Sequence, residues 1–408
     1  MRTFYAECIL CKRRYEAEPS ITVCKCGGIL DIKYQYHSID ALKFKYDICK
    51  SKEKGLWKYS SLLPVDQAFV NYNLLIGNTP QYNSKVLAKD LGVKAVLVKD
   101  DSRNPTSSLK DRASALAIVK AVESRNCIVA CASTGNAASS LAGNAAANGL
   151  KSVIFVPERI PMGKLNQLLI YGAEVIVVKG SYAKAFEVSE HMINQNSWYN
   201  RNAAINPFLI EGKKTVAFEI CEQYNWEKID FVSVPVGDGC TIASIWKGFK
   251  ELNTIGVIDY LPRIISVQAK GCAPINRAFR ANSTEIENCS DNTIADSIAV
   301  GSPRNYIKAI NAIKESNGIV VDVSDELIYD AMRYLGEKCG IFAEPAAAVS
   351  FAGLFKLKRK KLFGANCTIA TIVTGSGLKD PVNAQVAATK KPYFIDTIED
   401  IANLDVCI

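Results

Sequence analysis

Short apolar runs alternate with longer segments of helical spacing through most of the chain. Short runs rich in β-branched residues predict strands, and they cover residues 95–99, 127–130, 152–156, 174–178, 231–234, 264–268 and 368–373. Segments whose apolar residues recur every three or four positions predict helices, at residues 107–124, 137–148, 162–171 and 242–252. The alternation predicts an α/β fold with parallel sheets covered by helices on both faces.

Parallel sheets bind ligands at the carboxyl ends of their strands, where loops lead into helix N-termini. The first candidate loop runs from Asn104 to Arg112 and contains Lys110 at a helix start. The helix dipole disfavours a lysine there, but it would, together with Arg112, lower the pKa of a lysine that must be neutral to form an imine. An ordinary surface lysine is the alternative.

Three more loops follow predicted strands and are rich in glycine and hydroxyl groups. They cover residues 132–137 (ASTGNA), 235–241 (PVGDGCT) and 373–381 (VTGSGLKDP). Such loops expose backbone N–H groups that suit a carboxylate or a phosphate, although each alone could be a capped helix start or a tight turn. Asp238 argues against a phosphate beside its side chain, unless only the backbone faces the ligand. The polar stretch 282–296 is interpreted as a surface loop.

The N-terminal cysteines form a separate pattern, in which Cys8 and Cys11 make a CxxC and Cys24 and Cys26 make a CxC. Four thiolates brought together by a short hairpin suit tetrahedral zinc and leave no open position for catalysis. Free thiols are the alternative interpretation. His37 and His191 have no partners at ligand spacing.

Composition narrows the function classes for this chain of 408 residues. The formal net charge is +8, but the Lys and Arg residues are spread along the chain, which argues against nucleic-acid binding. No apolar run is long enough to span a bilayer. Most other cysteines lie singly in apolar segments, which is typical of buried thiols in a reducing compartment, so we expect a cytoplasmic protein.

In this order, the four loops resemble the fold type II (tryptophan-synthase β-like) enzymes that depend on pyridoxal 5'-phosphate (PLP), and within them the threonine synthase family. The resemblance covers most of the chain and includes further segments at residues 77–80 (GNTP), 162–165 (MGKL), 171–173 (YGA), 211–219 (EGKKTVAFE), 245–249 (IWKGF) and 340–346 (GIFAEPA). The cysteine-bearing N-terminus is similar to an extension found on some archaeal-type members. The resemblance implies a two-lobed fold with PLP in the cleft between the lobes.

The resemblance also implies roles for individual residues. Lys110 would carry the cofactor as an imine and move protons, Asn136 would bond the ring hydroxyl, and Thr374 would face the ring nitrogen. The cofactor phosphate would be held by one loop, namely Val236, Gly237, Asp238, Gly239, Cys240 and Thr241. Substrate binding is expected from Ser133, Thr134 and Arg112.

The implied reaction converts O-phosphohomoserine and water to threonine and phosphate, a carbon–oxygen lyase reaction. Departures from the family pattern cluster around the ligand: residues 237–241 read GDGCT where GNGGN is typical, and Ser376 replaces a usual His or Asn. A related enzyme on another substrate therefore stays open, such as a cysteate synthase that uses O-phosphoserine and sulfite. A threonine or serine dehydratase and a homologue without turnover are further alternatives.

The expected architecture has three parts. Residues 1–40 form a zinc-ribbon-like segment with four cysteine ligands, residues 41–84 and 206–408 form a large PLP-binding lobe, and residues 85–205 form a smaller lobe. The family resemblance implies a homodimer.

Overall fold

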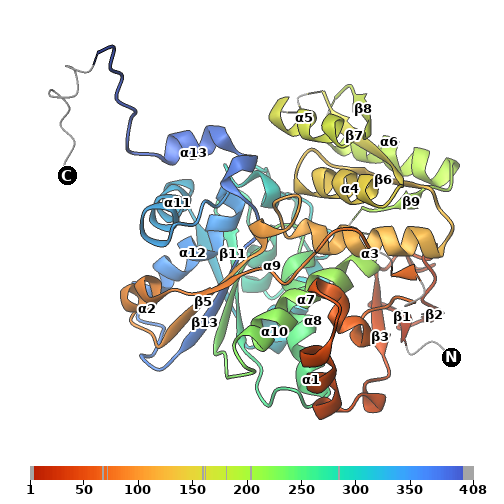
Figure 1. Cartoon of the computed structure of the whole chain (residues 1–408), viewed down its shortest axis with the longest axis horizontal. Coiled ribbons are helices and arrows are strands. Elements are labelled where there is room, and N and C mark those ends of the chain that lie inside the picture. The colour runs from red at the N-terminus through yellow and green to blue at the C-terminus, as the bar shows by residue number, and fades with distance from the viewer. Residues whose placement is uncertain are drawn as a thin grey trace.

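The computed structural model describes residues 4–66, 69–70, 72–158, 160, 162–180, 182–202, 205–283 and 285–397. Within these residues the strands form three sheets, of three, six and four strands. Figure 1 shows the two larger sheets in separate lobes, with the N-terminal sheet packed beside them. The α/β fold predicted from the alternating pattern is confirmed.

The large lobe is built on a six-stranded sheet in the order β12-β11-β10-β13-β5-β4. Its strands are β4 (Gln81–Asn83), β5 (Ala95–Asp100), β10 (Phe231–Pro235), β11 (Arg263–Ala269), β12 (Ile319–Val323) and β13 (Thr368–Val373). All pairs are parallel except β4 with β5 at the edge. Every residue of β13 is buried, as expected for a strand whose two faces are both covered.

Helices cover both faces of this sheet. One apolar core contains side chains of α7 (Phe208–Gln223), α8 (Cys240–Thr254), α9 (Pro274–Arg280) and α10 (Tyr306–Glu315). A second core, on the opposite face, contains side chains of α2 (Lys85–Leu91), α11 (Asp325–Cys339) and α12 (Pro345–Lys358). The short α13 (Pro381–Ala387) packs on α11.

The smaller lobe contains a four-stranded parallel sheet in the order β8-β7-β6-β9. Its strands are β6 (Ile128–Ala132), β7 (Lys151–Pro157), β8 (Glu174–Val178) and β9 (Tyr199–Asn200). The helices α3 (Lys110–Glu123), α4 (Asn136–Ala147) and α5 (Met162–Ile170) share one core with this sheet, and α6 (Tyr182–Gln195) covers the other face.

The predicted start of the smaller lobe at Lys85 is wrong, because β5 pairs in parallel with β13 and so belongs to the large sheet. The sequence of a strand does not specify which strand it pairs with, so it does not show which sheet the strand joins. The seven predicted strands are confirmed with small shifts at their ends, whereas β4, β9 and β12 of the two larger sheets were not predicted.

The N-terminal sheet is antiparallel in the order β2-β1-β3, with β1 (Phe4–Cys8), β2 (Arg14–Glu16) and β3 (Leu30–Tyr34), and α1 (Ala41–Lys50) follows it. Tyr34 Oη donates to Glu211 on α7 at 2.6 Å. Lys247 on α8 bonds both Asp31 (3.1 Å) and Glu211 (2.6 Å). The N-terminal sheet is thereby joined to the large lobe by buried polar contacts.

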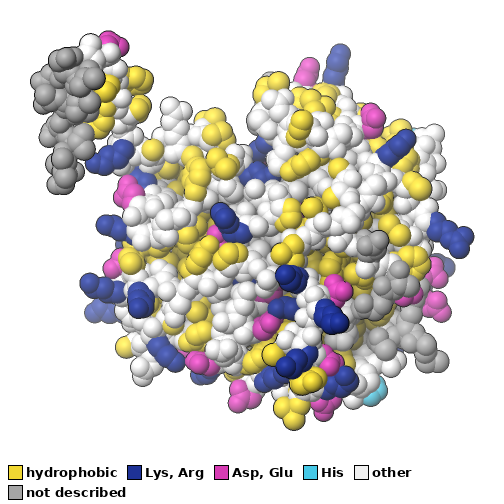
Figure 2. All heavy atoms as spheres, viewed as in Figure 1, with side chains coloured by type: hydrophobic (Ala, Val, Ile, Leu, Met, Phe, Trp, Pro, Cys, Tyr) yellow, Lys and Arg dark blue, Asp and Glu magenta, His cyan; other side chains and the backbone are white. Residues whose placement is uncertain are grey.

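Two properties of the structure bear on membrane spanning and on nucleic-acid binding. No helix in the described part of the chain is long and apolar enough to cross a membrane. On the face drawn in Figure 2, the Lys and Arg side chains of the described residues are scattered among Asp and Glu. This face therefore offers no basic stripe of the kind that binds a nucleic-acid backbone.

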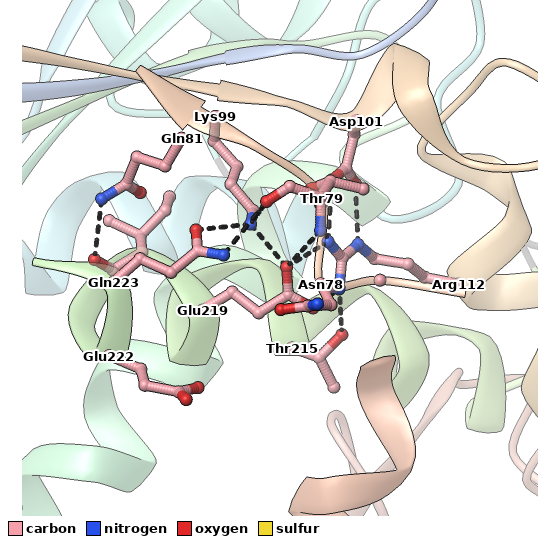
Figure 3. Close-up of polar contacts among 12 residues, drawn as sticks. Asn78, Thr79, Gln81, Lys99, Asp101, Arg112, Thr215, Glu219, Glu222 and Gln223 are labelled. Carbon is pink, nitrogen blue, oxygen red and sulfur yellow. Dashed lines mark hydrogen bonds and ion pairs between the residues drawn. The ribbon is translucent and has the colours of Figure 1, made fainter. Parts of the chain in front are cut away.

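A buried ion cluster joins the two lobes (Figure 3). The Arg112 guanidinium of α3 bonds Asp101 through Nε and Nη2, at 2.7 Å each, and Glu219 of α7 through Nη1 and Nη2, at 2.7 and 2.9 Å. Lys99 of β5 adds a second cation, 2.5 Å from Glu219. All four side chains in these ion pairs are fully shielded from water.

The GNTP segment completes this cluster. The backbone N–H groups of Asn78 and Thr79 donate to the Glu219 carboxylate. Gly77 has φ +78°, and a Cβ there would lie 2.5 Å from Glu219 Oε1, so only glycine lets the segment approach so closely. Burial alone would raise the pKa of Glu219, but Arg112 and Lys99 hold it below its usual range.

We expect Glu219→Gln to lower the free energy of unfolding by about 3–5 kcal/mol, because it leaves two buried cations without their shared carboxylate. The matched control is Asp47→Asn, which removes the exposed pair of Lys43 and Asp47 and should cost far less, because solvent screens exposed charges. Urea denaturation followed by circular dichroism gives both values. Equal losses in the two variants would contradict the importance assigned to the cluster.

Candidate active site

A cavity of about 670 Å³ lies between the lobes and is lined from both sides. The smaller lobe contributes Lys110 and residues 131–137, and the large lobe contributes Lys213, residues 237–241 and parts of the segment 289–304. Its volume falls in the range of pockets that bind small molecules and cofactors. Most of the loops predicted from the sequence therefore meet at one site.

Lys110 is the first residue of α3 and lies on the cavity wall. The preceding loop is fixed because Asp111 accepts hydrogen bonds from the backbone N–H of Thr106 (2.7 Å) and from its hydroxyl (2.5 Å). Leu109 N donates to the Thr374 carbonyl at 2.9 Å. Burial, followed by the nearby charges of Lys213 and Arg201, lowers the pKa of Lys110 to about 8. A substantial fraction of neutral amine is thus present near pH 8.

The loop before α4 places Ser133, Thr134 and Asn136 on the cavity wall. Asn136 Nδ2 donates to Glu344 across the cleft, at 2.8 and 3.1 Å from its two carboxylate oxygens. Burial raises the pKa of Glu344, although the bond from Asn136 and the charge of Lys110 oppose that shift. The Asn136 amide is therefore held by the opposite lobe.

The glycine loop before α8 is closely packed on its outer side. A Cβ on Gly237 would lie 2.8 Å from the Ile298 Cα, and one on Gly239, which has φ +93°, would lie 2.8 Å from the Asn305 carbonyl. Asp238 Oδ1 accepts from Arg304 N at 2.8 Å, and its Oδ2 accepts from Asn305 Nδ2 at 3.3 Å. The carboxylate is thereby engaged by neighbouring groups, and the start of α8 offers N–H donors to an anion.

Three predicted site residues are not among the described residues that line the cavity. Val236 is 1% exposed, and its N–H bonds the Val267 carbonyl. Thr374 contributes its carbonyl to the Lys110 loop. Arg112 was expected to bind substrate, and the structure corrects this, because its guanidinium is fully buried between Asp101 and Glu219.

The sequence interpretation missed Lys213 and Arg201, which both line the cavity. Residues 282–296 were interpreted as a surface loop, and Asp291 and Asp296 of this stretch are indeed exposed but also line the cavity. The only available signal for Lys213 was a pair of adjacent lysines in the segment EGKKTVAFE.

The four N-terminal cysteines form a separate cluster. The sulfur atoms of Cys8, Cys11, Cys24 and Cys26 all lie within 4.8 Å of one another. Such a set of four soft ligands suits a tetrahedral metal ion.

The cavity fits PLP in size and chemistry. It combines a lysine of lowered pKa with a helix-start loop that can bind a phosphate. A family model described as a pyridoxal-phosphate dependent enzyme matches residues 72–375. The fold and the cavity thus define a PLP-dependent enzyme of fold type II.

Sequence relatives narrow the class further. A threonine synthase from Methanocaldococcus jannaschii is 42% identical over 95% of this chain and 96% of that protein. One from Methanosarcina acetivorans is 37% identical over 98% and 97%. The chain therefore belongs to the threonine synthase family of PLP-dependent enzymes.

Solved structures agree on the fold. Maize serine racemase superposes with a TM-score of 0.65 at 23% identity, covering 76% of this chain and 91% of that chain. Serine racemase from Dictyostelium discoideum gives a TM-score of 0.61 at 26% identity, with 73% and 92% covered.

Capture of PLP by the cofactor-free protein should depend on pH through Lys110. The neutral amine is the nucleophile, so the rate of covalent attachment should rise up to a pH of about 8 and then level off. An ordinary lysine would keep gaining reactivity to about pH 10. Absorbance of the attached cofactor gives the rate, and Lys110→Ala should show no attachment. A rate that still climbs at pH 10 would contradict the lowered pKa.

Proposed function

We propose that this enzyme is a threonine synthase, which converts O-phosphohomoserine and water to threonine and phosphate. The observation that carries the proposal is the 42% identity to a threonine synthase over nearly the whole length of both chains. The cavity supports it, because a phosphorylated amino acid needs anion-binding groups beside the cofactor site, and both lobes supply cations and N–H donors there.

Bound PLP supplies an electron sink that stabilises negative charge developing on the carbon atoms of the substrate. Lys110 Nζ is the group that removes and returns protons, since a pKa near 8 lets it act in both directions at physiological pH. Ser133 and Thr134 bind the substrate carboxylate through hydroxyl and backbone donors.

The remaining cofactor contacts are proposed as follows. Asn136 bonds the ring hydroxyl, and Glu344 keeps its amide oriented. The loop from Val236 to Thr241 holds the phosphate through its backbone, with Asp238 turned to its own neighbours. Thr374 lies at the strand end next to the Lys110 loop and faces the ring nitrogen.

The cysteate synthase alternative is not favoured, because the relatives that match over most of the chain are named threonine synthases. The departures at residues 237–241 and at Ser376 are then differences that the same reaction tolerates.

The purified, PLP-loaded enzyme should release phosphate and form threonine from O-phosphohomoserine, and should give no cysteate from O-phosphoserine with sulfite. Colorimetric phosphate determination and amino-acid chromatography measure both products, with Lys110→Ala as the inactive control. Product from the second substrate pair alone would replace the proposal with cysteate synthase. Inactivity on both substrates would rule out both proposed reactions but would not affect the assignment of the PLP site.

We further propose that Cys8, Cys11, Cys24 and Cys26 hold a structural zinc ion, as their clustered sulfur atoms allow. The bound metal would fix the turns that connect the N-terminal strands, and the last of these strands carries Asp31 and Tyr34 to α8 and α7.

The purified chain should contain about one zinc ion per molecule, and Cys11→Ser should lose most of it because four thiolates are needed to close the tetrahedron. The exposed Cys49 provides the control, since Cys49→Ser should keep its metal. Mass spectrometry of the metal content decides the matter. A metal-free wild-type chain after expression with zinc would show that the four residues are free thiols.

A cytoplasmic location and a homodimer complete the proposal. None of the described cysteines forms a disulfide bond, which suits a reducing compartment. The dimer rests on the family resemblance, and light scattering of the purified protein measures its mass.

A further inference from the structure

Lys213 is a buried lysine on the wall of the active-site cavity. It belongs to α7, is 1% exposed, and lines the same cavity as Lys110 and the loop at residues 237–241. Within the described part of the chain, Lys213 takes part in no ion pair or hydrogen bond through its side chain. The Lys213 side chain is therefore both buried and without a direct polar partner.

The other deeply buried lysines behave differently. Lys99 pairs with Glu219 at 2.5 Å, and Lys120 pairs with Glu123 at 2.6 Å. Lys214, the next residue in α7, contacts Glu211 and Glu251 at 2.6 Å each. A buried ammonium without a counter-charge is costly. These three lysines have carboxylates at ion-pair distance, whereas no carboxylate of the described residues lies that close to Lys213.

The surroundings of Lys213 favour an anion from outside the chain. Burial lowers the pKa of Lys213, the charge of Arg201 lowers it further, and Cys240 and Asp238 oppose the shift. The charge of Lys213 in turn lowers the pKa of the nearby Lys110. Asp238 is engaged by Arg304 N and Asn305, and burial raises the pKa of the Cys240 thiol to about 12. Asp238 acts on Lys213 only from beyond ion-pair distance, so the ammonium has no direct negative partner among the described residues.

The adjoining loop indicates what the anion is. Residues 237–241 lead into the N-terminus of α8 and offer uncharged N–H donors. Such donors and a lysine ammonium together are a common arrangement for phosphate binding, in which the lysine acts as a point charge. We propose that Lys213 is the counter-charge for a phosphate monoester dianion bound against this loop.

This proposal deepens the proposed function and rests on it for the identity of the ligands. Both PLP and O-phosphohomoserine carry a phosphate monoester, so the cofactor and the substrate are two sources of the same chemistry. Binding measurements with simple probes separate them.

The central variants are Lys213→Met, which keeps the length without the charge, and Lys213→Arg, which keeps the charge. If the cofactor phosphate is the ligand, Lys213→Met should weaken PLP binding about 10- to 100-fold. Binding of pyridoxal, which has no phosphate, should weaken much less, only as far as the lost Lys213 charge lets the pKa of Lys110 rise. Lys213→Arg should recover most of the PLP affinity. Equilibrium dialysis of the cofactor-free protein measures both.

If the substrate phosphate is the ligand, PLP binding in Lys213→Met should weaken no more than pyridoxal binding does. Inorganic phosphate binding to the PLP-loaded enzyme, measured by calorimetry, should then weaken by about 10- to 100-fold. These assays need no turnover, so a failure to form threonine would overturn the proposed function without affecting this result.

Thermal unfolding separates a ligand-binding role from a structural one. In phosphate-free buffer, Lys213→Met should leave the melting temperature of the cofactor-free protein unchanged or raised, because an unpaired buried charge is removed. Lys214→Met is the control and should lower it, because two buried carboxylates lose their cation. Unchanged affinity for both PLP and phosphate, or destabilisation of Lys213→Met equal to that of Lys214→Met, would overturn the proposal.

Discussion

The buried pairing of Arg112 with Asp101 and Glu219 is the contact on which the active site depends. Arg112 lies two residues after Lys110 on α3, and Glu219 lies six residues after Lys213 on α7, so one ion cluster holds both lysine-bearing helices. Gly212 allows the two helices to approach, since a Cβ there would lie 2.0 Å from the Arg112 carbonyl oxygen. The charges cannot separate without exposing unpaired ions to a dry interior.

A second polar network holds α7 from the N-terminal side. Glu211 accepts from Tyr34 and pairs with Lys214 and Lys247, and Lys247 continues to Asp31 on the N-terminal sheet. α7 is therefore fixed at two places along its length, with Lys213 between them. This arrangement explains how a helix can keep an unpaired ammonium at a cavity, because the rigid supports offset the local cost.

The cavity between the lobes combines several cations with N–H donors and keeps the nearby carboxylates engaged. Asp238 is bonded by its neighbours, and Glu344 accepts from Asn136. Such a positive site attracts anionic ligands and lowers the pKa of its own lysines, which is the condition that Lys110 needs for its chemistry. Binding and catalysis here share one electrostatic cause.

Local patterns in the sequence determined seven of the strands, four of the helices, the loops at strand ends and the clustering of the four cysteines, because each depends on residues close together in the chain. The tertiary structure alone decided which sheet β5 joins and which side chains reach the cavity. Arg112 follows Lys110 by two positions, and residues two apart on a helix do not share a face, so one faces the cavity and the other an ion cluster. Lys213 and Lys214 are adjacent in sequence, yet only Lys214 packs against Glu211 and Glu251. Tertiary packing therefore decides that Lys214 is paired and that Lys213 faces the cavity.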